Sequence, residues 1–170
     1  PIRDRENREG LWNALRNQEL DFIVSDHSPS TPVLKFMESG DFQKAWGGIA
    51  SLQLGLSIIW TEAQKRGFSF TDIAHWMSAR PAEFVGLAGK KGAIASGYDA
   101  DFVLWDPDRR FEVTQSMIHH RHKMTPYEGQ TLSGRIERTY LRGKKIFENG
   151  TFPQQPFGQI LTRNDDATHT

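Results

Sequence analysis

One carboxylate, Asp26, stands where a short apolar run gives way to a polar loop. The run is Phe22-Ile-Val-Ser25, and His27-Ser-Pro-Ser30 follows. A parallel strand ends in this way when it delivers a catalytic or metal-binding group to the C-terminal edge of a barrel. A carboxylate there could ligate a divalent cation and also accept a proton from water. Aspartate before Ser-Pro-Ser is equally typical of a turn or cap, so the pattern leaves both interpretations open.

The residues beside Asp26 could support the same site. Neighbours on an extended chain point to opposite sides, so we expect His27 to serve in packing or support and not to bind the same cation. Ser28 shares the side of Asp26 and could contact a substrate, or its hydroxyl could cap the turn. Gly47 and Gly48 begin a predicted helix. Their bare N–H groups could meet a carbonyl or carboxylate, or they could simply give a flexible entry to the helix.

A second histidine group, His119-His-Arg-His122, could also be taken for a metal site. His120 and His122 could face one way on a strand, but no carboxylate accompanies them, and Arg121 and Lys123 add positive charge. We therefore interpret this segment as a solvated basic loop. The chain has no cysteine, so any metal must be held by oxygen and nitrogen ligands, which suits zinc, manganese, cobalt or magnesium.

Composition narrows the class of protein. The 21 basic and 21 acidic residues balance, and no segment builds a dense Lys/Arg face, which argues against a nucleic-acid partner. The longest mostly apolar stretch, residues 49–60, is shorter than the roughly 20 residues of a membrane span. We expect no membrane partner and take a cytoplasmic location as the default. A chain that opens with Pro1 and a charged helix is expected to be part of something longer.

Apolar spacing and turn residues predict the elements that would position these groups. In chain order they are a helix over 4–18 with Leu11, Trp12 and Leu15 inward, a strand over 21–25, a functional loop over 27–47, a helix over 48–66, a helix capped at Thr71-Asp72, a break at Arg80-Pro81 with a further short helix, a strand over 102–105, and a hairpin of 136–141 and 144–148 around Arg142-Gly143. We predict three parts: an α/β layer over 1–88, a small β-rich segment over 89–155, and a polar tail over 156–170.

Four motifs, taken in order, carry a resemblance to a known family. They are Ser25-Asp-His-Ser-Pro29, Trp46-Gly-Gly-Ile-Ala-Ser-Leu-Gln53, Ala79-Arg-Pro-Ala82 and Gly97-Tyr-Asp-Ala-Asp-Phe-Val-Leu-Trp-Asp106. Together they resemble the cyclic amidohydrolases, and within them the allantoinase group. The resemblance extends from Pro1 to about Gly150, and the ordered set is far more specific than any single motif.

The resemblance implies an α/β fold, the C-terminal part of a (β/α)8 TIM-like barrel with part of a small β-rich domain. In that family the Ser-Asp-His sequence ends the eighth strand. The implied activity is hydrolysis of the hydantoin ring of allantoin to allantoate by a site with two divalent ions, usually zinc. Asp26 would bind one metal and pass a proton to the departing ring nitrogen. Ser28 would lie near the substrate, and Gly47 and Gly48 would wall the site. Homo-oligomers, tetramers in the family, are implied as well.

The sequence departs from the family pattern in its metal ligands. The family uses a His-x-His pair, a carboxylated lysine and two further histidines from earlier strands, whereas the only His-x-His here is His120-x-His122. We expect a C-terminal fragment that is inactive and weakly stable alone, because one carboxylate cannot hold two zinc ions. Two rivals remain: a dihydropyrimidinase or hydantoinase with the same barrel, and a non-catalytic scaffold relative.

Overall fold

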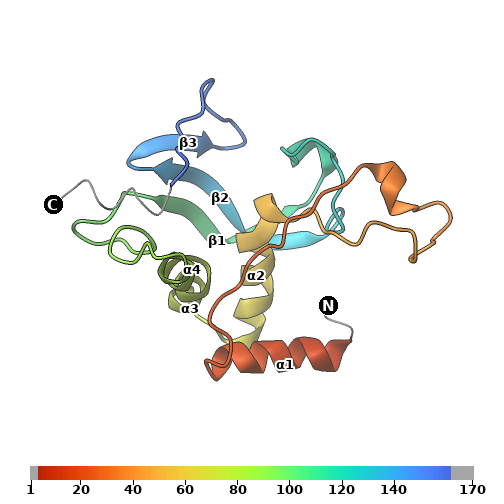
Figure 1. Ribbon diagram of the computed structural model, residues 1–170, viewed down its shortest axis with the longest axis horizontal. Helices are drawn as coiled ribbons and strands as arrows, with labels where there is room; N and C mark the ends of the chain where they lie inside the picture. The colour runs from red at the N-terminus through yellow and green to blue at the C-terminus, as the bar shows by residue number, and fades with distance from the viewer. Residues whose placement is uncertain (1–3, 162–170) are drawn as a thin grey trace.

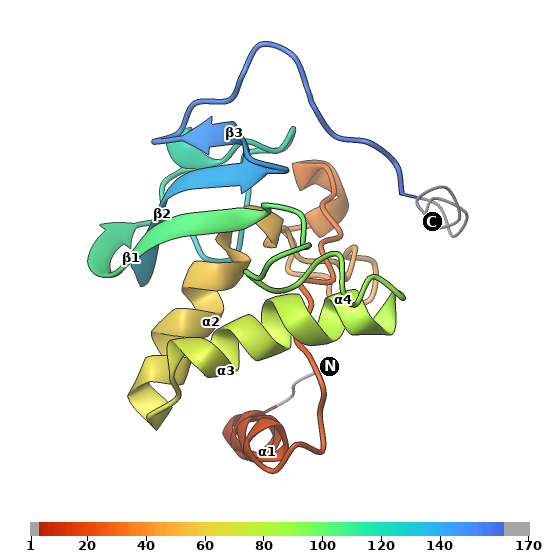
Figure 2. The same ribbon diagram turned by 90° about the vertical axis from the view of Figure 1, so that its left-hand side faces the viewer.

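The computed structural model describes residues 4–161, arranged in layers (Figures 1 and 2). An antiparallel sheet of order β1-β2-β3 forms one side, with β1 at Phe102–Glu112, β2 at Thr131–Leu141 and β3 at Lys144–Glu148. Helices α2 (Gly55–Ala63), α3 (Phe70–Ala74) and α4 (Arg80–Phe84) lie beneath the sheet, and α1 (Arg5–Arg16) lies farthest from it. The predicted tail is described only as far as Leu161, and its residues 162–170 lie outside the described range.

The predicted hairpin is confirmed. Strands β2 and β3 pair antiparallel and are joined by Arg142 and Gly143, with φ of 48° and 75°. Positive φ at both central residues is typical of the tight turn that matches strand twist. Strand β1 runs well beyond the predicted 102–105 and contains Pro107, which cannot donate a ladder hydrogen bond. The register with β2 shifts between Asp106 and Arg110, so the proline is accommodated in an irregularity.

Helix α1 agrees closely with the predicted 4–18. Asp4 caps it by accepting a 2.8 Å hydrogen bond from the Asn7 N–H. Trp12 and Leu15 are buried as predicted. The prediction for Leu11 was wrong, because that side chain is 40% exposed.

The helix predicted over 48–66 begins later than expected. A 3-10 turn at Leu52–Leu54 leads into α2, and a second at Gln64–Arg66 ends before Gly67. Ile49 is not helical; it forms a single parallel bridge with His27 and is 45% exposed. The buried side chains of these turns recur every three residues and form one stripe, made of Leu54, Ser57, Trp60 and Ala63.

The break predicted at Arg80-Pro81 does not occur. Helix α3, a π-helical turn at His75–Ala79 and α4 form one continuous rod (Figure 2). The wider turn ends just before the position where the ring of Pro81 would meet the carbonyl of Met77, four residues back. The N-cap is Ser69 and not Thr71-Asp72, since Ser69 and Asp72 exchange side-chain and backbone bonds in a capping box.

The strand predicted over 21–25 is absent. These residues pass through the layers with one backbone hydrogen bond, 3.1 Å from the Ile23 N–H to the Trp76 carbonyl. A strand needs a second strand to bond, and none of the strands among the described residues pairs with this run. Val24 is accordingly 66% exposed. The predicted division of the chain at residues 88 and 89 stays a prediction.

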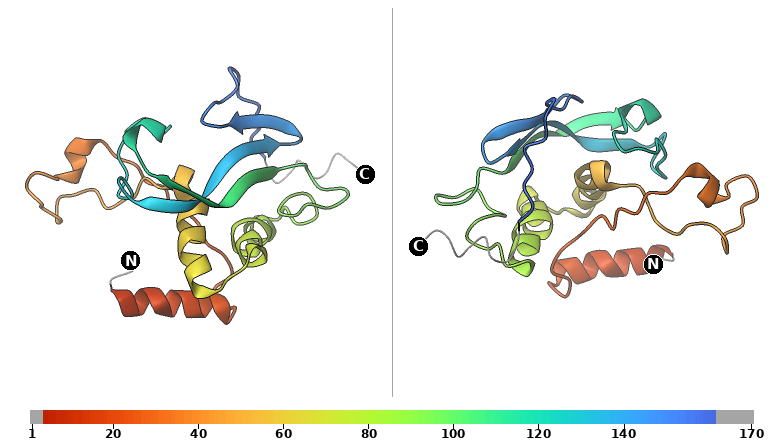
Figure 3. Two further views of the ribbon diagram at one scale, coloured as in Figure 1. Left: turned by 180° about the vertical axis from the view of Figure 1, so that it is seen from behind. Right: turned by 45° about the horizontal axis from the view of Figure 1, so that its top comes forward.

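The loop predicted over 27–47 is long and projects from the body of the molecule (Figure 3). Its one regular piece is the 3-10 turn Pro32–Lys35. Large apolar side chains on it are open to solvent, with Met37 73% and Phe42 93% exposed. Among residues 4–161, no helix has the length and apolar character required to cross a membrane.

Two buried clusters hold the layers together, and the chain from Leu52 to Ala63 contributes to both. The larger joins α1, α2 and the α3–α4 rod and consists of Trp12, Leu15, Trp60, Ala63, Phe68, Ile73 and Trp76. The smaller lies under the sheet and consists of Leu54, Val113, Ile118 and Leu132. Trp60 also donates a 2.9 Å hydrogen bond from Nε1 to the Pro107 carbonyl, which ties α2 to β1.

Strand β2 approaches α2 so closely that only glycine fits at position 134. The Ser57 hydroxyl donates a 2.6 Å hydrogen bond to the Gly134 carbonyl. A Cβ on Gly134 would lie 2.8 Å from the ring of Trp105 and 2.9 Å from that of Trp60, and its φ is +88°. Both steric space and backbone conformation therefore require glycine here.

We predict that Gly134→Ala lowers the free energy of unfolding by about 2–4 kcal/mol, through a left-handed backbone cost and overpacking against two indoles. Gly129→Ala is the matched control. Its φ is +76° but no atom lies within 4 Å, so it carries the backbone cost alone, about 1 kcal/mol. Urea denaturation measures both variants, and equal losses would contradict the close approach.

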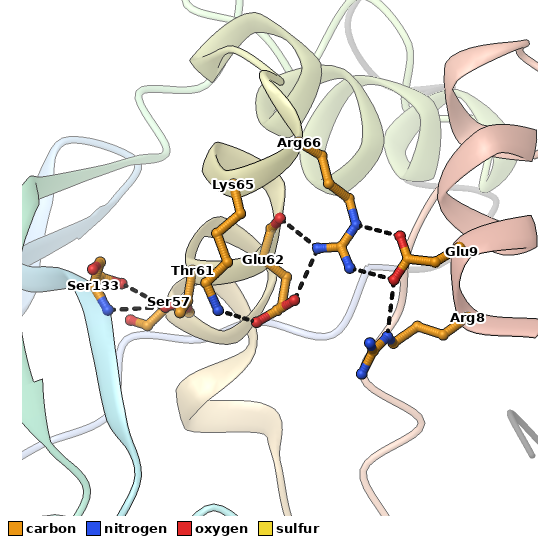
Figure 4. A network of polar contacts seen from close by, with 8 residues as sticks. All are labelled: Arg8, Glu9, Ser57, Thr61, Glu62, Lys65, Arg66 and Ser133. Carbon is orange, nitrogen blue, oxygen red and sulfur yellow. Dashed lines mark hydrogen bonds and ion pairs between the residues drawn. The ribbon is translucent and has the colours of Figure 1, made fainter. Parts of the chain in front are cut away.

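An ion-pair network fastens α1 to the end of α2 (Figure 4). Arg66 meets Glu9 through two hydrogen bonds, of 2.9 Å from Nε and 2.6 Å from an Nη, and also donates 2.8 Å to Glu62. The hydrogen bonds from Arg66 hold the pKa of Glu9 at about 2. The pKa of Arg66 is raised, first of all by the hydrogen bonds to Glu9.

We predict that this pair stabilises the fold in a pH-dependent manner. A carboxyl whose folded pKa lies below its unfolded value of 4.5 stabilises the fold above 4.5 and loses that effect as pH falls toward about 2. The thermal midpoint of Glu9→Gln should therefore lie below that of the wild type at pH 7, with the gap narrowing below pH 4.5. Glu38→Gln, on the exposed loop, should show no such gap. A gap that stays constant down to pH 3 would contradict the pairing.

Candidate functional site

Asp26 is presented to solvent on a constrained turn. Its φ is +44°, in the left-handed region that Asp and Asn enter more readily than other side chains. The residue is exposed, and within residues 4–161 its carboxylate has no hydrogen-bond or ion-pair partner. A carboxylate with free lone pairs at the mouth of a turn is available to a cation or a substrate.

The turn is bonded on both sides to a second segment, residues 49–52. His27 Nδ1 accepts two hydrogen bonds of 3.1 Å, from the backbone N–H groups of Ser51 and Leu52. The Ser51 hydroxyl donates 3.1 Å to the Ser25 carbonyl, and the Ser28 N–H donates 3.0 Å to the Ile49 carbonyl. Bonds on each side of Asp26 therefore connect the turn to the beginning of α2.

Ser28 faces the glycine pair. Its hydroxyl accepts a 3.3 Å hydrogen bond from Trp46 Nε1. A Cβ on Gly48 would overlap the carbonyl oxygen and the side chain of Ser28, whereas a Cβ on Gly47 would meet nothing within 4 Å. Gly48 is thus required by close packing, and Gly47 is not.

The prediction that Gly47 and Gly48 begin a helix was wrong. Helical turns start at Leu52, and both glycines lie in an irregular segment before it. The N–H groups of Ser51 and Leu52, the first of that helix, are bonded to His27. These glycines therefore do not form a helix-end anion site.

Lys35 holds the glycine segment from the other end of the loop. Its ammonium donates 2.7 Å to the Trp46 carbonyl and also donates to the Gly48 carbonyl. Sequence reasoning missed this contact, because a lysine bonded to carbonyls eleven and thirteen residues away leaves no periodic signal. Lys35 thus joins the first part of the loop to its last residues, Trp46 and Gly48.

A cavity of about 490 Å³ lies between the start of α2 and the sheet. The cavity is lined by side chains that include His27, Gln53, His120 and Phe147. The rings of His27 and His120 are 5.5 Å apart, edge to face. His120 Nδ1 is buried without a hydrogen-bond partner, and burial, followed by the nearby His27, lowers the pKa of His120.

The segment 119–122 is only partly the solvated loop that was predicted. His119 and Arg121 are exposed, but His120 is half-buried in the cavity wall. Gln53 fixes this segment by accepting 2.8 Å from the His119 N–H and donating 2.7 Å to the Met117 carbonyl. A glutamine in the first turn of a helix carries no sequence signal for such a role.

Within residues 4–161, no three His, Asp or Glu side chains come close enough to hold a metal ion together. Asp26 and His27 are adjacent but do not act together. The carboxylate has no partner among residues 4–161, whereas the imidazole Nδ1 is bonded to backbone N–H groups. The described residues can therefore supply one carboxylate ligand but not a complete metal site.

Comparison with known proteins defines the class. The model of the amidohydrolase family matches residues 3–146, and the chain belongs to that family. It is 50% identical to the allantoinase of Streptomyces avermitilis over 163 residues, which cover 96% of this chain and 36% of the relative. It is 43% identical to the allantoinase of Saccharomyces cerevisiae, over 95% of this chain and 34% of that relative. The chain thus spans about a third of the length of these curated relatives.

Solved structures agree with this family. A D-hydantoinase superposes with a TM-score of 0.82 at 31% identity, covering 89% of this chain and 34% of that one. The expected fold, part of an amidohydrolase barrel with a small β-rich portion, is consistent with this match.

We predict that Gly48→Ala disrupts the turn and Gly47→Ala does not. The added methyl at position 48 must displace the Ser28 backbone, at a cost of about 1–3 kcal/mol for overpacking. Position 47 is open, so its substitution should stay within about 0.5 kcal/mol. Amide exchange of Ser28, whose N–H bonds Ile49, measures the effect directly. Slow exchange at Ser28 in Gly48→Ala would show that the packing is looser than the structure has it.

Proposed function

We propose that this chain is part of a cyclic amidohydrolase that opens the hydantoin ring of allantoin to give allantoate. We further propose that it works within a polypeptide of its relatives' length, the full-length protein. The observation that carries the proposal is the free carboxylate of Asp26, held on a bonded turn in a chain 50% identical to an allantoinase. The substrate would be a small molecule, and a homo-oligomeric assembly stays a prediction.

Asp26 is proposed to handle the proton. Hydrolysis adds hydroxide to the ring carbonyl carbon, breaks the bond to the ring nitrogen, and leaves a carboxylate and a ureido group. The proton released by the attacking water must reach the departing nitrogen. An exposed carboxylate without a partner can accept that proton and return it within one turnover.

A divalent metal is part of the proposal, because metal dependence is general in the amidohydrolase family. Such a cation, when bound, supplies an activated nucleophile at neutral pH and polarises the carbonyl under attack. Asp26 has the donor chemistry for one ligand, since its oxygens are free. The other ligands of one or two zinc ions would have to come from outside residues 4–161.

Ser28 and the glycines are proposed to shape the substrate pocket. The Ser28 hydroxyl accepts from Trp46, which leaves its own proton available to donate to a substrate carbonyl. Gly48 brings the backbone against Ser28, and Gly47, exposed beside it, would form part of the wall. A cyclic amide presents carbonyl and N–H groups that suit such a pocket.

A hydantoinase or dihydropyrimidinase is the second candidate. The superposition on a D-hydantoinase favours it, but at 31% identity against 43–50% for the allantoinases. The two activities share a ring-opening reaction and differ in substrate. Turnover of allantoin and of dihydrouracil by the full-length protein separates them.

We predict that Asp26→Asn in the full-length protein lowers kcat on allantoin by about 10²–10⁴-fold, because the amide can neither accept the proton nor carry charge to a cation. Glu38→Gln removes an exposed carboxyl from the adjoining loop and should leave kcat unchanged. The 170-residue chain alone, with added zinc, should show no turnover. Full activity of Asp26→Asn would refute the proposed role.

A further inference from the structure

The beginning of the helix that leads into α2 is capped from a distant part of the chain. The first N–H groups of a helix have no partner within it, and a side chain at the N-cap usually accepts from them. Ser51 occupies the N-cap but makes no such bond; its hydroxyl donates instead to the Ser25 carbonyl. The acceptor is His27 Nδ1, 3.1 Å from both the Ser51 and the Leu52 nitrogens.

This arrangement assigns the imidazole a definite state. An atom that accepts two N–H bonds must carry a lone pair, so the proton of the neutral ring lies on Nε2. Nδ1 is then unavailable to any cation. His27 is therefore a structural acceptor, although it adjoins the proposed ligand Asp26.

The cap also constrains Asp26. A non-glycine residue with positive φ is held there only by its surroundings. Three sets of bonds hold this turn, made by the Ser25 carbonyl, the His27 ring and the Ser28 N–H. Of these three, the His27 pair uses a side chain from the turn itself; the Ser28 hydroxyl also accepts a bond, from Trp46 in the projecting loop.

We propose that His27 is a positioning residue, whose Nδ1 caps the helix leading into α2 and thereby fixes the turn that presents Asp26. This inference rests on the proposed function for its catalytic consequence, but the cap itself can be tested without any activity.

Two substitutions separate the acceptor from the rest of the ring. Asparagine places its side-chain oxygen where Nδ1 stands, one bond from Cγ, and so can keep both hydrogen bonds. Glutamine carries its oxygen one bond farther, near the position of Nε2, and loses them. His27→Asn and His27→Gln are therefore matched variants that differ in where the acceptor lies.

Amide exchange on the 170-residue chain is the first measurement. In His27→Gln the Ser51 and Leu52 amides should exchange about 10-fold faster or more, since a hydrogen bond is lost at each. His27→Asn should stay within about 3-fold of the wild type, and strand β2 serves as the internal reference for global folding. If the β2 amides also exchange faster in His27→Gln, that variant has lost global stability and His27→Asn alone tests the cap. Fast exchange of the Ser51 and Leu52 amides in His27→Asn would then overturn the cap.

Metal content and kinetics of the full-length protein are the second measurement. His27→Gln should lower metal content or kcat by about 10–100-fold with little change in KM, and His27→Asn should restore most of the loss. Two results would overturn the positioning role. One is a kcat and metal content in His27→Asn no higher than in His27→Gln. The other is unchanged kcat and metal content in His27→Gln although its Ser51 and Leu52 amides exchange fast. Full activity of Asp26→Asn would instead refute the proposed function, with the exchange result still standing for the cap.

Discussion

The burial of α2 between two clusters is the constraint on which the rest of the structure depends. Trp60 packs its ring 4.7 Å from Phe70 and 5.5 Å from Trp105, and its Nε1 bonds the Pro107 carbonyl. One indole thus contacts the α3 helix and the sheet together. With Ala63 fully buried on the same stripe, α2 cannot rotate or slide without exposing apolar area on both sides. The turn that carries Asp26 is held in place by the same packing, because its hydrogen bonds are made to Ser51 and Leu52, which lead into α2.

Local signals allowed much of the fold to be predicted. The spacing of Trp12 and Leu15 placed the inner face of α1, and Arg142-Gly143 placed the β2–β3 turn, since both patterns depend on residues a few positions apart. Asp26 was singled out because it follows an apolar run, and the structure places it in an exposed turn. Its chemical role stays a prediction, since only the rest of a metal site would define it.

Other features could not be predicted, because long-range contacts determine them. The run 21–25 has strand composition but lacks a neighbouring strand among the described residues. His27, Lys35 and Gln53 each bond backbone groups far away in the sequence, and no periodicity marks such a bond. The break at Arg80-Pro81 was predicted because a proline ring disfavours a continuing helix. The π-helical turn that precedes Pro81 lets the rod continue.

The contact between Ser28 and Ile49 closes the projecting loop at its base. The Ser28 N–H donates a 3.0 Å hydrogen bond to the Ile49 carbonyl. The entropy lost in closing a loop grows only with the logarithm of its length, about 0.6 kcal/mol for each doubling. The residues between Lys35 and Trp46 can therefore gain or lose length at little thermodynamic cost, because the contacts that hold the turn are made by residues outside that stretch. Proteins with this base are free to diverge by insertion and deletion in the loop without moving the carboxylate beside it.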